Sequence, residues 1–245
     1  MPANASAAPA DRVIDIAALR FAWPGAARTV VDIESLHIAR GERVFLRGPS
    51  GSGKSTLLSL LAGVVAANEG RLNVLGRDLG TLSGAQRDHF RADHIGFIFQ
   101  MFNLIPYLSV VENVSLPCGF SSLRRERAVK AGGSVQAEAL RLLEHLDMSA
   151  GGLLDRKVTD LSVGQQQRVA AARALIGAPE LVIADEPTSA LDSDRRTAFI
   201  DLLFRECTRA NAALVFVSHD AALADLFDRT IEFREINRAA LAVAA

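Results

Sequence analysis

The sequence has few cysteines and no excess of charge of either sign. Cys118 and Cys207 are its two cysteines, and they stand in no spacing typical of metal ligands. Free thiols in a reducing compartment are therefore expected, and a disulfide between them is the less favoured alternative. The 27 basic and 28 acidic residues give a net charge of −1. The charge balance thus gives no electrostatic indication of nucleic-acid binding.

Long apolar runs are also missing from the sequence. The most apolar stretch, residues 56–67, is shorter than the roughly 20 residues that a helix needs to span a bilayer. The first residues, MPANASAAPAD, contain neither the basic start nor the hydrophobic segment of a secretory signal. We predict a disordered tail over residues 1–11 and a second tail over residues 237–245.

Short apolar runs predict the strands of the fold, and near-continuous runs are typical of strands buried on both faces of a parallel sheet. The predicted strands cover residues 13–19, 42–48, 94–100, 180–185 and 212–218. Helical patterns separate them, so the expected class is α/β with a mostly parallel core sheet. Residues 101–159 show helical spacing and few strand signals. We predict a helical subdomain there, inserted between core segments 12–100 and 160–236 of a domain that covers residues 12–236.

Residues 48–56, GPSGSGKST, fit the pattern G-x4-G-K-S/T between a predicted strand and a predicted helix. Glycines allow a tight turn that points backbone N–H groups at phosphate oxygens, and the helix adds partial positive charge at its N-terminus. Lys54 is expected to reach the β- and γ-phosphates, Ser55 to bind Mg²⁺, and Thr56 to lie near the α-phosphate. The predicted ATP-binding residues of this loop are Gly48, Pro49, Ser50, Gly51, Ser52, Gly53, Lys54, Ser55 and Thr56.

Two acidic residues, Asp185 and Glu186, follow the apolar run LVIA. A buried strand of this kind delivers Asp185 to the carboxyl edge of the sheet, where open α/β sheets bind ligands. We predict that Asp185 holds Mg²⁺ through water, since Mg²⁺ keeps several of its waters. Glu186 is predicted to be the general base for a water in line with the γ-phosphate. An acid pair that merely faces solvent is the alternative.

The stretch LSVGQ opens a predicted helix and narrows the class of protein. Its residues are Leu161, Ser162, Val163, Gly164 and Gln165. A serine hydroxyl and glycine N–H groups at a helix start form a second anion cradle, which one chain does not need for a single γ-phosphate. The stretch resembles the LSGGQ signature of ABC-type ATPases.

Five further residues agree with that family and occur in its order along the chain. Gln100 matches the glutamine of the Q-loop, and His219 matches the switch histidine. Ser189 and Asp192 belong to SALD, which matches the D-loop. Trp23 lies where the family places an aromatic ring under adenine, although a purely structural tryptophan is the alternative. The resemblance implies a P-loop NTPase fold of ABC type with an antiparallel β part at the N-terminus.

The resemblance covers residues 13–233 and implies a head-to-tail dimer with ATP and Mg²⁺. Each of two ATPs would lie between one phosphate loop and the partner's LSVGQ, so that assembly gates phosphoryl transfer. Gln100 would contact Mg²⁺ or the attacking water, and His219 would contact the γ-phosphate. Asp192 would reach across the dimer, and Trp23 would stack on adenine.

Val163 stands where the family usually has the first glycine of the signature. A left-handed backbone at this position would cost valine about 1–2 kcal/mol. A helical or extended backbone would make the substitution nearly free. Because Gly164 is retained, we expect an active site with altered dimer closure.

The absence of membrane spans implies that any transport pathway belongs to separate permease subunits. Such a subunit would lie at the cytoplasmic face of the cell membrane, held there by the permease. Residues 91–117 resemble the lipoprotein-release and macrolide-export type of ABC ATPase. Polar amino-acid importers, which share SALD around Ser189, are the alternative, followed by soluble ABC ATPases without a transport role. The apolar residues expected to line the permease groove beside Gln100, within residues 101–117, are Phe102, Leu104, Ile105, Tyr107 and Leu108.

Overall fold

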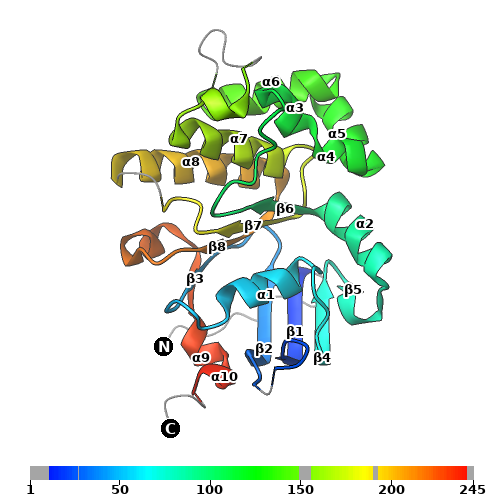
Figure 1. Cartoon of the computed structure of the whole chain (residues 1–245), viewed down its shortest axis with the longest axis vertical. Coiled ribbons are helices and arrows are strands. Elements are labelled where there is room, and N and C mark those ends of the chain that lie inside the picture. Colours follow the sequence, from blue (N-terminus) through cyan, green and yellow to red (C-terminus); the bar gives the residue numbers. More distant parts are fainter. Residues whose placement is uncertain (1–10, 27, 149–155, 190–192, 242–245) are drawn as a thin grey trace.

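The computed structural model describes residues 11–26, 28–148, 156–189 and 193–241, which form two sheets and a layer of helices (Figure 1). The central sheet has the strand order β6-β7-β8-β3-β9, and every neighbouring pair in it is parallel. Its strands are β3 (Arg43–Arg47), β6 (Ile95–Ile98), β7 (Leu181–Asp185), β8 (Ala213–Val217) and β9 (Arg229–Glu232). Strands that are neighbours in the sheet but distant in sequence require helical crossovers between them.

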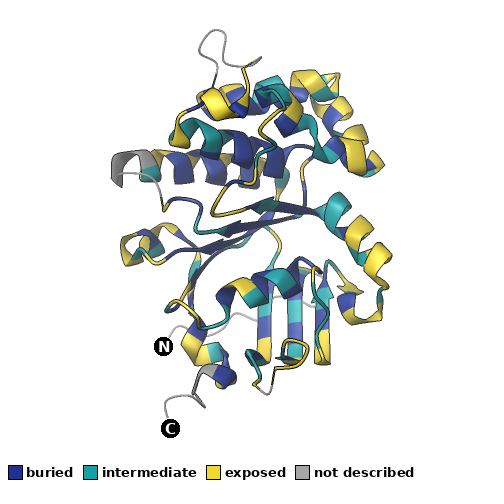
Figure 2. Ribbon diagram, in the orientation of Figure 1, coloured by how far each residue is buried: buried dark blue, intermediate teal, exposed yellow. Residues whose placement is uncertain are grey.

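The near-continuous apolar runs of β7 and β8 fit their burial on both faces of this sheet (Figure 2). All of β8 is buried, and so are the first residues of β7, up to Ala184. Side chains alternate between the faces with a period of two. One apolar cluster holds Phe45, Val182, Ala184, Leu214 and Phe216. A second cluster on the opposite face holds Val44, Leu46, Ile183, Val215 and Val217.

The second sheet is antiparallel, with the order β2-β1-β4-β5. Its strands are β1 (Arg12–Phe21), β2 (Val31–Ala39), β4 (Glu69–Val74) and β5 (Arg77–Asp78). Helix α1 (Lys54–Leu61) lies between the two sheets, and its buried leucines share one apolar cluster with strands of both (Figure 1). The expected α/β class, with a parallel core and an antiparallel β part, is confirmed.

Helices cover the other face of the parallel sheet and share its first apolar cluster (Figure 1). They are α3 (Val110–Ser115), α4 (Pro117–Phe120), α5 (Ser122–Gly132), α6 (Val135–His145), α7 (Val163–Leu175) and α8 (Ser193–Ala210). The remaining helices are α2 (Gly84–His94), α9 (Phe233–Ile236), α10 (Arg238–Leu241) and the short 3₁₀ helices η2 (Leu79–Thr81), η3 (Val158–Asp160) and η4 (Ala221–Leu226). None of the helices in the described ranges combines the length and apolar character of a membrane span.

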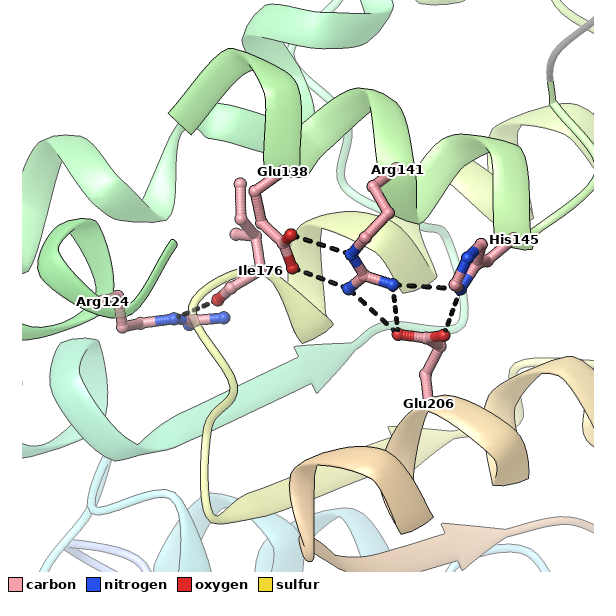
Figure 3. A network of polar contacts seen from close by, with 6 residues as sticks. All are labelled: Arg124, Glu138, Arg141, His145, Ile176 and Glu206. Atoms are coloured by element: carbon pink, nitrogen blue, oxygen red, sulfur yellow. Dashed lines mark hydrogen bonds and ion pairs between the residues drawn. The ribbon is translucent and has the colours of Figure 1, made fainter. Parts of the chain in front are cut away.

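A buried arginine joins α5 to the C-terminal end of α7. Arg124, in α5, is 3% exposed and donates a hydrogen bond to the carbonyl oxygen of Ile176 at 2.7 Å (Figure 3). It also donates to the carbonyl oxygen of Ala174 at 2.6 Å. Burial lowers the pKa of Arg124 to about 10, so the guanidinium is still charged at neutral pH. It satisfies carbonyl groups at the C-terminal end of α7, where helices leave acceptors unpaired.

A second polar network joins α6 to α8 (Figure 3). Arg141 donates to both carboxylate oxygens of Glu138, at 2.8 and 2.6 Å, and also contacts Glu206 at 3.3 Å. The Nδ1 atom of His145 lies 2.7 Å from Glu206. Burial alone would raise the pKa of Glu206, but the hydrogen bonds from His145 and Arg141 outweigh it and lower this pKa.

Two segments near the predicted site begin or end at different residues from those expected. Strand β6 ends at Ile98 rather than at Gln100, because the chain turns there: the amide of Phe102 bonds the carbonyl of Phe99, and Phe102 itself has a φ of 59°. Asn237 falls in the C-terminal tail expected from the sequence, whereas its side chain is fully buried between β2 and the phosphate loop.

Candidate active site

A cavity of about 560 Å³ lies at the carboxyl ends of β3, β7 and β8. Open α/β sheets bind their ligands at this edge. Residues from both sequence motifs and from the Q-loop and switch positions line it together, although they are far apart in the chain. The predicted site residues in its wall are Ser50, Gly51, Gly53, Lys54, Ser55, Thr56, Gln100, Asp185, Glu186, Ser189 and His219.

The phosphate loop connects β3 to α1 and depends on glycine conformations. Gly51 and Gly53 have φ angles of 73° and 103°, in the left-handed region that other residues rarely adopt. A Cβ atom on Gly53 would also come within 2.9 Å of the carbonyl oxygen of Val30. The loop is therefore closed tightly against the chain behind it, while its remaining N–H groups can face the cavity.

Lys54 is 7% exposed and points back over its own loop. Its Nζ atom donates to the carbonyl oxygens of Gly48 (2.7 Å) and Pro49 (2.9 Å). Burial lowers the pKa of Lys54, and the charges of Glu186 and Asp185 oppose that shift. The ammonium group thus provides a positive charge beside the loop, at the place where a phosphate chain would lie.

The acid pair stands where β7 ends, as expected. Burial raises the pKa of Asp185, against the opposing effect of a hydrogen bond with Ser55. Glu186 has a left-handed φ of 49°, and its backbone amide bonds the carbonyl of Val217 at 3.0 Å. This conformation costs a non-glycine residue of the order of 1–2 kcal/mol. Burial also raises the pKa of Glu186, so both carboxyl groups are held in an environment that disfavours their charged form.

Gln100 and His219 approach the acid pair from the two strands that flank β7. Gln100 is exposed and follows β6, and His219 follows β8 with a side chain that is 53% exposed. The Nε2 atom of His219 lies 3.1 Å from the Oε1 atom of Glu186, at ion-pair distance. Ser189 is fixed by its amide, which bonds the carbonyl of Glu186 at 3.3 Å. Asp192 lies outside the described residues.

The signature residues do not line this cavity. Ser162 is the N-cap of α7: its Oγ accepts from the amide of Gln165 at 3.3 Å, and the side chain of Gln165 accepts from the amide of Ser162 at 2.9 Å. This reciprocal pair is a capping box. Val163 is the first residue of the helix and is 49% exposed. Its backbone is helical, so the strain of a left-handed valine does not arise.

Trp23 also lies away from the cavity wall. It follows β1 and is 44% exposed, and its ring meets that of Phe21 edge to face with centroids 5.1 Å apart. The carbonyl of Trp23 accepts from the amide of Ala26 in a turn. An exposed ring is compatible with stacking on adenine, and this role stays a prediction.

Sequence reasoning missed four polar residues of the cavity wall. Thr188 and Ser218 are direct neighbours of predicted residues, so their position in the sequence was a usable signal. Arg196, in α8, forms an ion pair with Asp220, whose Oδ1 atom accepts from the amide of Ala222 at 3.1 Å. Asp220 directly follows His219, but no motif in the sequence indicates Arg196 or its pairing with Asp220.

The arrangement suits a divalent cation held by few protein ligands. Within the described ranges, no three histidine, cysteine, aspartate or glutamate side chains gather into a metal-binding cluster. Mg²⁺ does not require one, since it binds through one or two protein oxygens together with substrate phosphates and water. Asp185 and Ser55 lie at the cavity wall and are hydrogen-bonded to each other. Their side-chain oxygens are ligands of the kind that Mg²⁺ prefers. These residues fit the ion.

The fold and the site define a P-loop NTPase. The sequence profile of the ABC transporter family matches residues 31–189, and the chain belongs to this family. It is an ABC-type ATPase with an ATP-binding cassette fold.

Named relatives and a solved structure agree with this assignment. The uncharacterized ABC transporter ATP-binding protein YbbA of Escherichia coli K12 is 42% identical over 80% of this chain and 82% of its own length. The macrolide export ATP-binding/permease protein MacB 1 of Aeromonas hydrophila is 42% identical over 82% of this chain, which spans 29% of that protein. The ATP-binding cassette MJ0796, solved as a dimer in a post-hydrolysis state with ADP and Pi, is 33% identical over 89% of this chain and 93% of its own, with a TM-score of 0.74.

Proposed function

We propose that the chain is the ATP-hydrolysing subunit of an export or lipoprotein-release type transporter, and that it dimerises head to tail around two ATPs. One observation carries the proposal: the chain has two anion-binding half-sites that do not meet within it. The cavity holds the phosphate loop and the acid pair, whereas Ser162, Val163 and Gly164 at the start of α7 lie outside it. A second copy can bring the start of its α7 to this cavity, and the dimeric cassette MJ0796 supports such an assembly.

The residues of the cavity take distinct roles in this proposal. Lys54 and the loop N–H groups bind the β- and γ-phosphates. Glu186 orients and deprotonates the attacking water, and its raised pKa brings it nearer to the operating pH of a general base. His219, beside Glu186, contacts the γ-phosphate. Ser55, Gln100 and Asp185 would hold Mg²⁺, whose positive charge would offset the charge that develops on the phosphates.

A separate apolar groove supports the proposal that a permease binds this chain. A second cavity of about 560 Å³ lies beside the Q-loop, and its wall includes Phe97, Phe99, Leu116, Pro117, Phe120 and Arg173. Met101 and Tyr107 in the adjoining loop are 81% and 76% exposed, whereas Phe102, expected at the groove, is buried core. Exposed aromatic and apolar side chains around a groove are typical of a protein-binding surface. The permease would hold the ATPase at the cytoplasmic face of the membrane.

A complementation experiment tests the head-to-tail site. Lys54→Ala removes the phosphate-loop cation, and Gly164→Asp places a negative charge at the start of α7 without opposing the helix dipole. Each variant alone should lack ATPase activity. A mixture should regain activity, because one of the two sites in the mixed dimer combines an intact loop with an intact signature. A mixture as inactive as the separate variants contradicts the composite site.

The permease assignment has its own test. Tyr107→Glu should weaken co-purification with a membrane permease and permease-stimulated ATPase activity, with ATP affinity unchanged. Exporter subunits should fractionate with membranes that contain the permease encoded with them. The importer alternative, which SALD around Ser189 keeps open, predicts a permease without a large extracytoplasmic domain.

A further inference from the structure

Asn237 is a fully buried asparagine whose side chain uses all of its hydrogen-bonding capacity. Its Nδ2 group donates to the carbonyl oxygens of Val30 (2.9 Å) and Ser52 (3.1 Å). Its Oδ1 atom accepts from the amides of Asp32 (2.8 Å) and Ala239 (3.3 Å). Reversing the amide would oppose donor to donor and acceptor to acceptor at every one of these contacts, so the orientation is determined by its partners.

Ser52 belongs to the phosphate loop, and its carbonyl group faces away from the ATP cavity. Gly51 and Gly53 on either side line the cavity, whereas Ser52 does not. A buried carbonyl group needs a donor, and Asn237 supplies it from a position 185 residues further along the chain. The contact holds the one residue of the loop that stands between its two left-handed glycines.

The same amide group also donates to Val30, in the chain segment behind the loop. Val30 lines the cavity, and its carbonyl oxygen is the atom that a Cβ on Gly53 would meet at 2.9 Å. Asn237 therefore bonds two backbone segments that touch each other. Phe233, fully buried one helical turn earlier, lies against the loop at Gly48 and Gly53, where an added Cβ would come within 3.1 and 3.4 Å of it.

Two side chains thus fix the two halves of the loop. Lys54 bonds the carbonyls of Gly48 and Pro49 in the first half, and Lys54 is also expected to bind phosphate. Asn237 bonds the second half from outside the cavity and has no direct path to the ligand. Its hold on Ser52 does not depend on where the lysine points.

We propose that Asn237 is a positioning residue for ATP binding: it fixes the carbonyl of Ser52 outward, so that the N–H groups of the loop face the phosphates. The inference rests on the proposed role of this cavity as the ATP site. Without Asn237, the part of the loop between Gly51 and Gly53 samples other conformations. ATP binding must then select the binding-competent conformation, which lowers the affinity. The loss should therefore appear mainly in affinity, since Glu186 and His219 lie on other strands.

Asn237→Asp tests this inference, because aspartate has nearly the same shape but faces the two carbonyl oxygens with an acceptor. We expect the Kd for ATP, measured by calorimetric titration of the full chain with and without Mg²⁺, to rise at least about tenfold. The turnover number at saturating ATP should fall by less than the affinity. Asn237→Thr, which retains one donor, keeps the test available if the aspartate variant does not fold, and should give a smaller rise.

Asn113→Asp is the matched control. Asn113 is also fully buried, donates to the carbonyls of Ile105 and Ser109, and accepts from the amide of Ile105, but none of these partners belongs to the phosphate loop. It should destabilise the fold and leave ATP affinity unchanged. An unchanged Kd in the Asn237 variants, or an equal rise in the Asn113 variant, would overturn the inference while leaving the ATP site in place. If Lys54→Ala also binds ATP with wild-type affinity, the site itself is wrongly assigned.

Discussion

The Nε2 atom of His219 lies 3.1 Å from the Oε1 atom of Glu186, and the pairing of two parallel strands places them there. Asp185 is in register with Val217 at the ends of β7 and β8, so the chain emerges from both strands at the same edge. The left-handed backbone of Glu186 then turns its side chain towards His219 and the phosphate loop. A carboxylate and an imidazole in contact at this edge can act on one water or one phosphate oxygen.

Glu186→Gln should leave ATP binding intact and slow hydrolysis by about 100-fold or more, the contribution typical of a general base. Glutamine keeps the shape and the hydrogen-bonding reach of glutamate but cannot take a proton. ATP affinity and phosphate release, measured on the same preparation, separate the two effects. Normal turnover in this variant would show that Glu186 is not the base.

The same substitution should make the protein more stable at neutral pH. Burial raises the pKa of Glu186 above its unfolded value, so the charged carboxylate favours the unfolded state. Below the unfolded pKa of about 4.5, Glu186 is protonated in both states and does not destabilise the folded state. As the pH rises through the folded pKa, this stability is lost, because the carboxylate ionises more easily in the unfolded chain. Urea unfolding without nucleotide should therefore give a stability advantage for Glu186→Gln at pH 7 that disappears near pH 4. A variant that is less stable at pH 7 would contradict this account.

Val163→Gly should change the ATPase rate by no more than about threefold. Val163 is the first residue of α7 and has a helical backbone, so glycine relieves no strain there. Dimer lifetime in the presence of ATP is the second measurement, because the exposed valine side chain faces whatever the start of α7 meets. Ser162→Ala is the control and should cost about 1 kcal/mol of stability through the lost cap. An inactive wild-type protein that the glycine restores would show that the valine disables the signature.

Glu206→Gln should lower stability at pH 7 by about 2 kcal/mol, because it weakens a nearly buried contact with Arg141 and His145. The lowered pKa of Glu206 means that its contribution is present above the unfolded pKa of about 4.5 and is lost as the pH falls through the folded value. The difference from wild type should shrink in urea unfolding at pH 3 to 4. Glu144→Gln, on an exposed position of α6, should have little effect at either pH.

Local sequence patterns were sufficient for four of the five strands of the parallel sheet, all except β9, and for the groups at its edge. The apolar runs that form β7 and β8 are buried on both faces of the sheet. The position of a residue at the end of such a strand is therefore fixed by the sheet. Asp185, Glu186 and His219 therefore lie together in the structure, as their places after apolar runs predict. The phosphate loop follows the same logic, because its glycines and its helix are consecutive in the chain.

Long-range side-chain contacts were beyond what those patterns could predict. Asn237 reaches Ser52, and Arg124 reaches Ile176, across separations for which the sequence carries no periodic signal. Helical spacing shows which face of a helix is buried, but it does not show which polar group satisfies a carbonyl on another element. Arg196 is missing from the predicted site for the same reason, since its partner Asp220 lies on a different segment.

The capping box at Ser162 also sets the polarity of the surface that α7 offers to a neighbour. The Oγ atom of Ser162 accepts a hydrogen bond from the amide of Gln165, whereas the cap does not use the hydroxyl hydrogen of Ser162. The amides of Val163 and Gly164, in the first turn, have no carbonyl partner within the helix. This end of the helix thus offers several unpaired hydrogen-bond donors and few free acceptors. Such a surface favours an anion over a cation by sign alone, before any shape complementarity is tested.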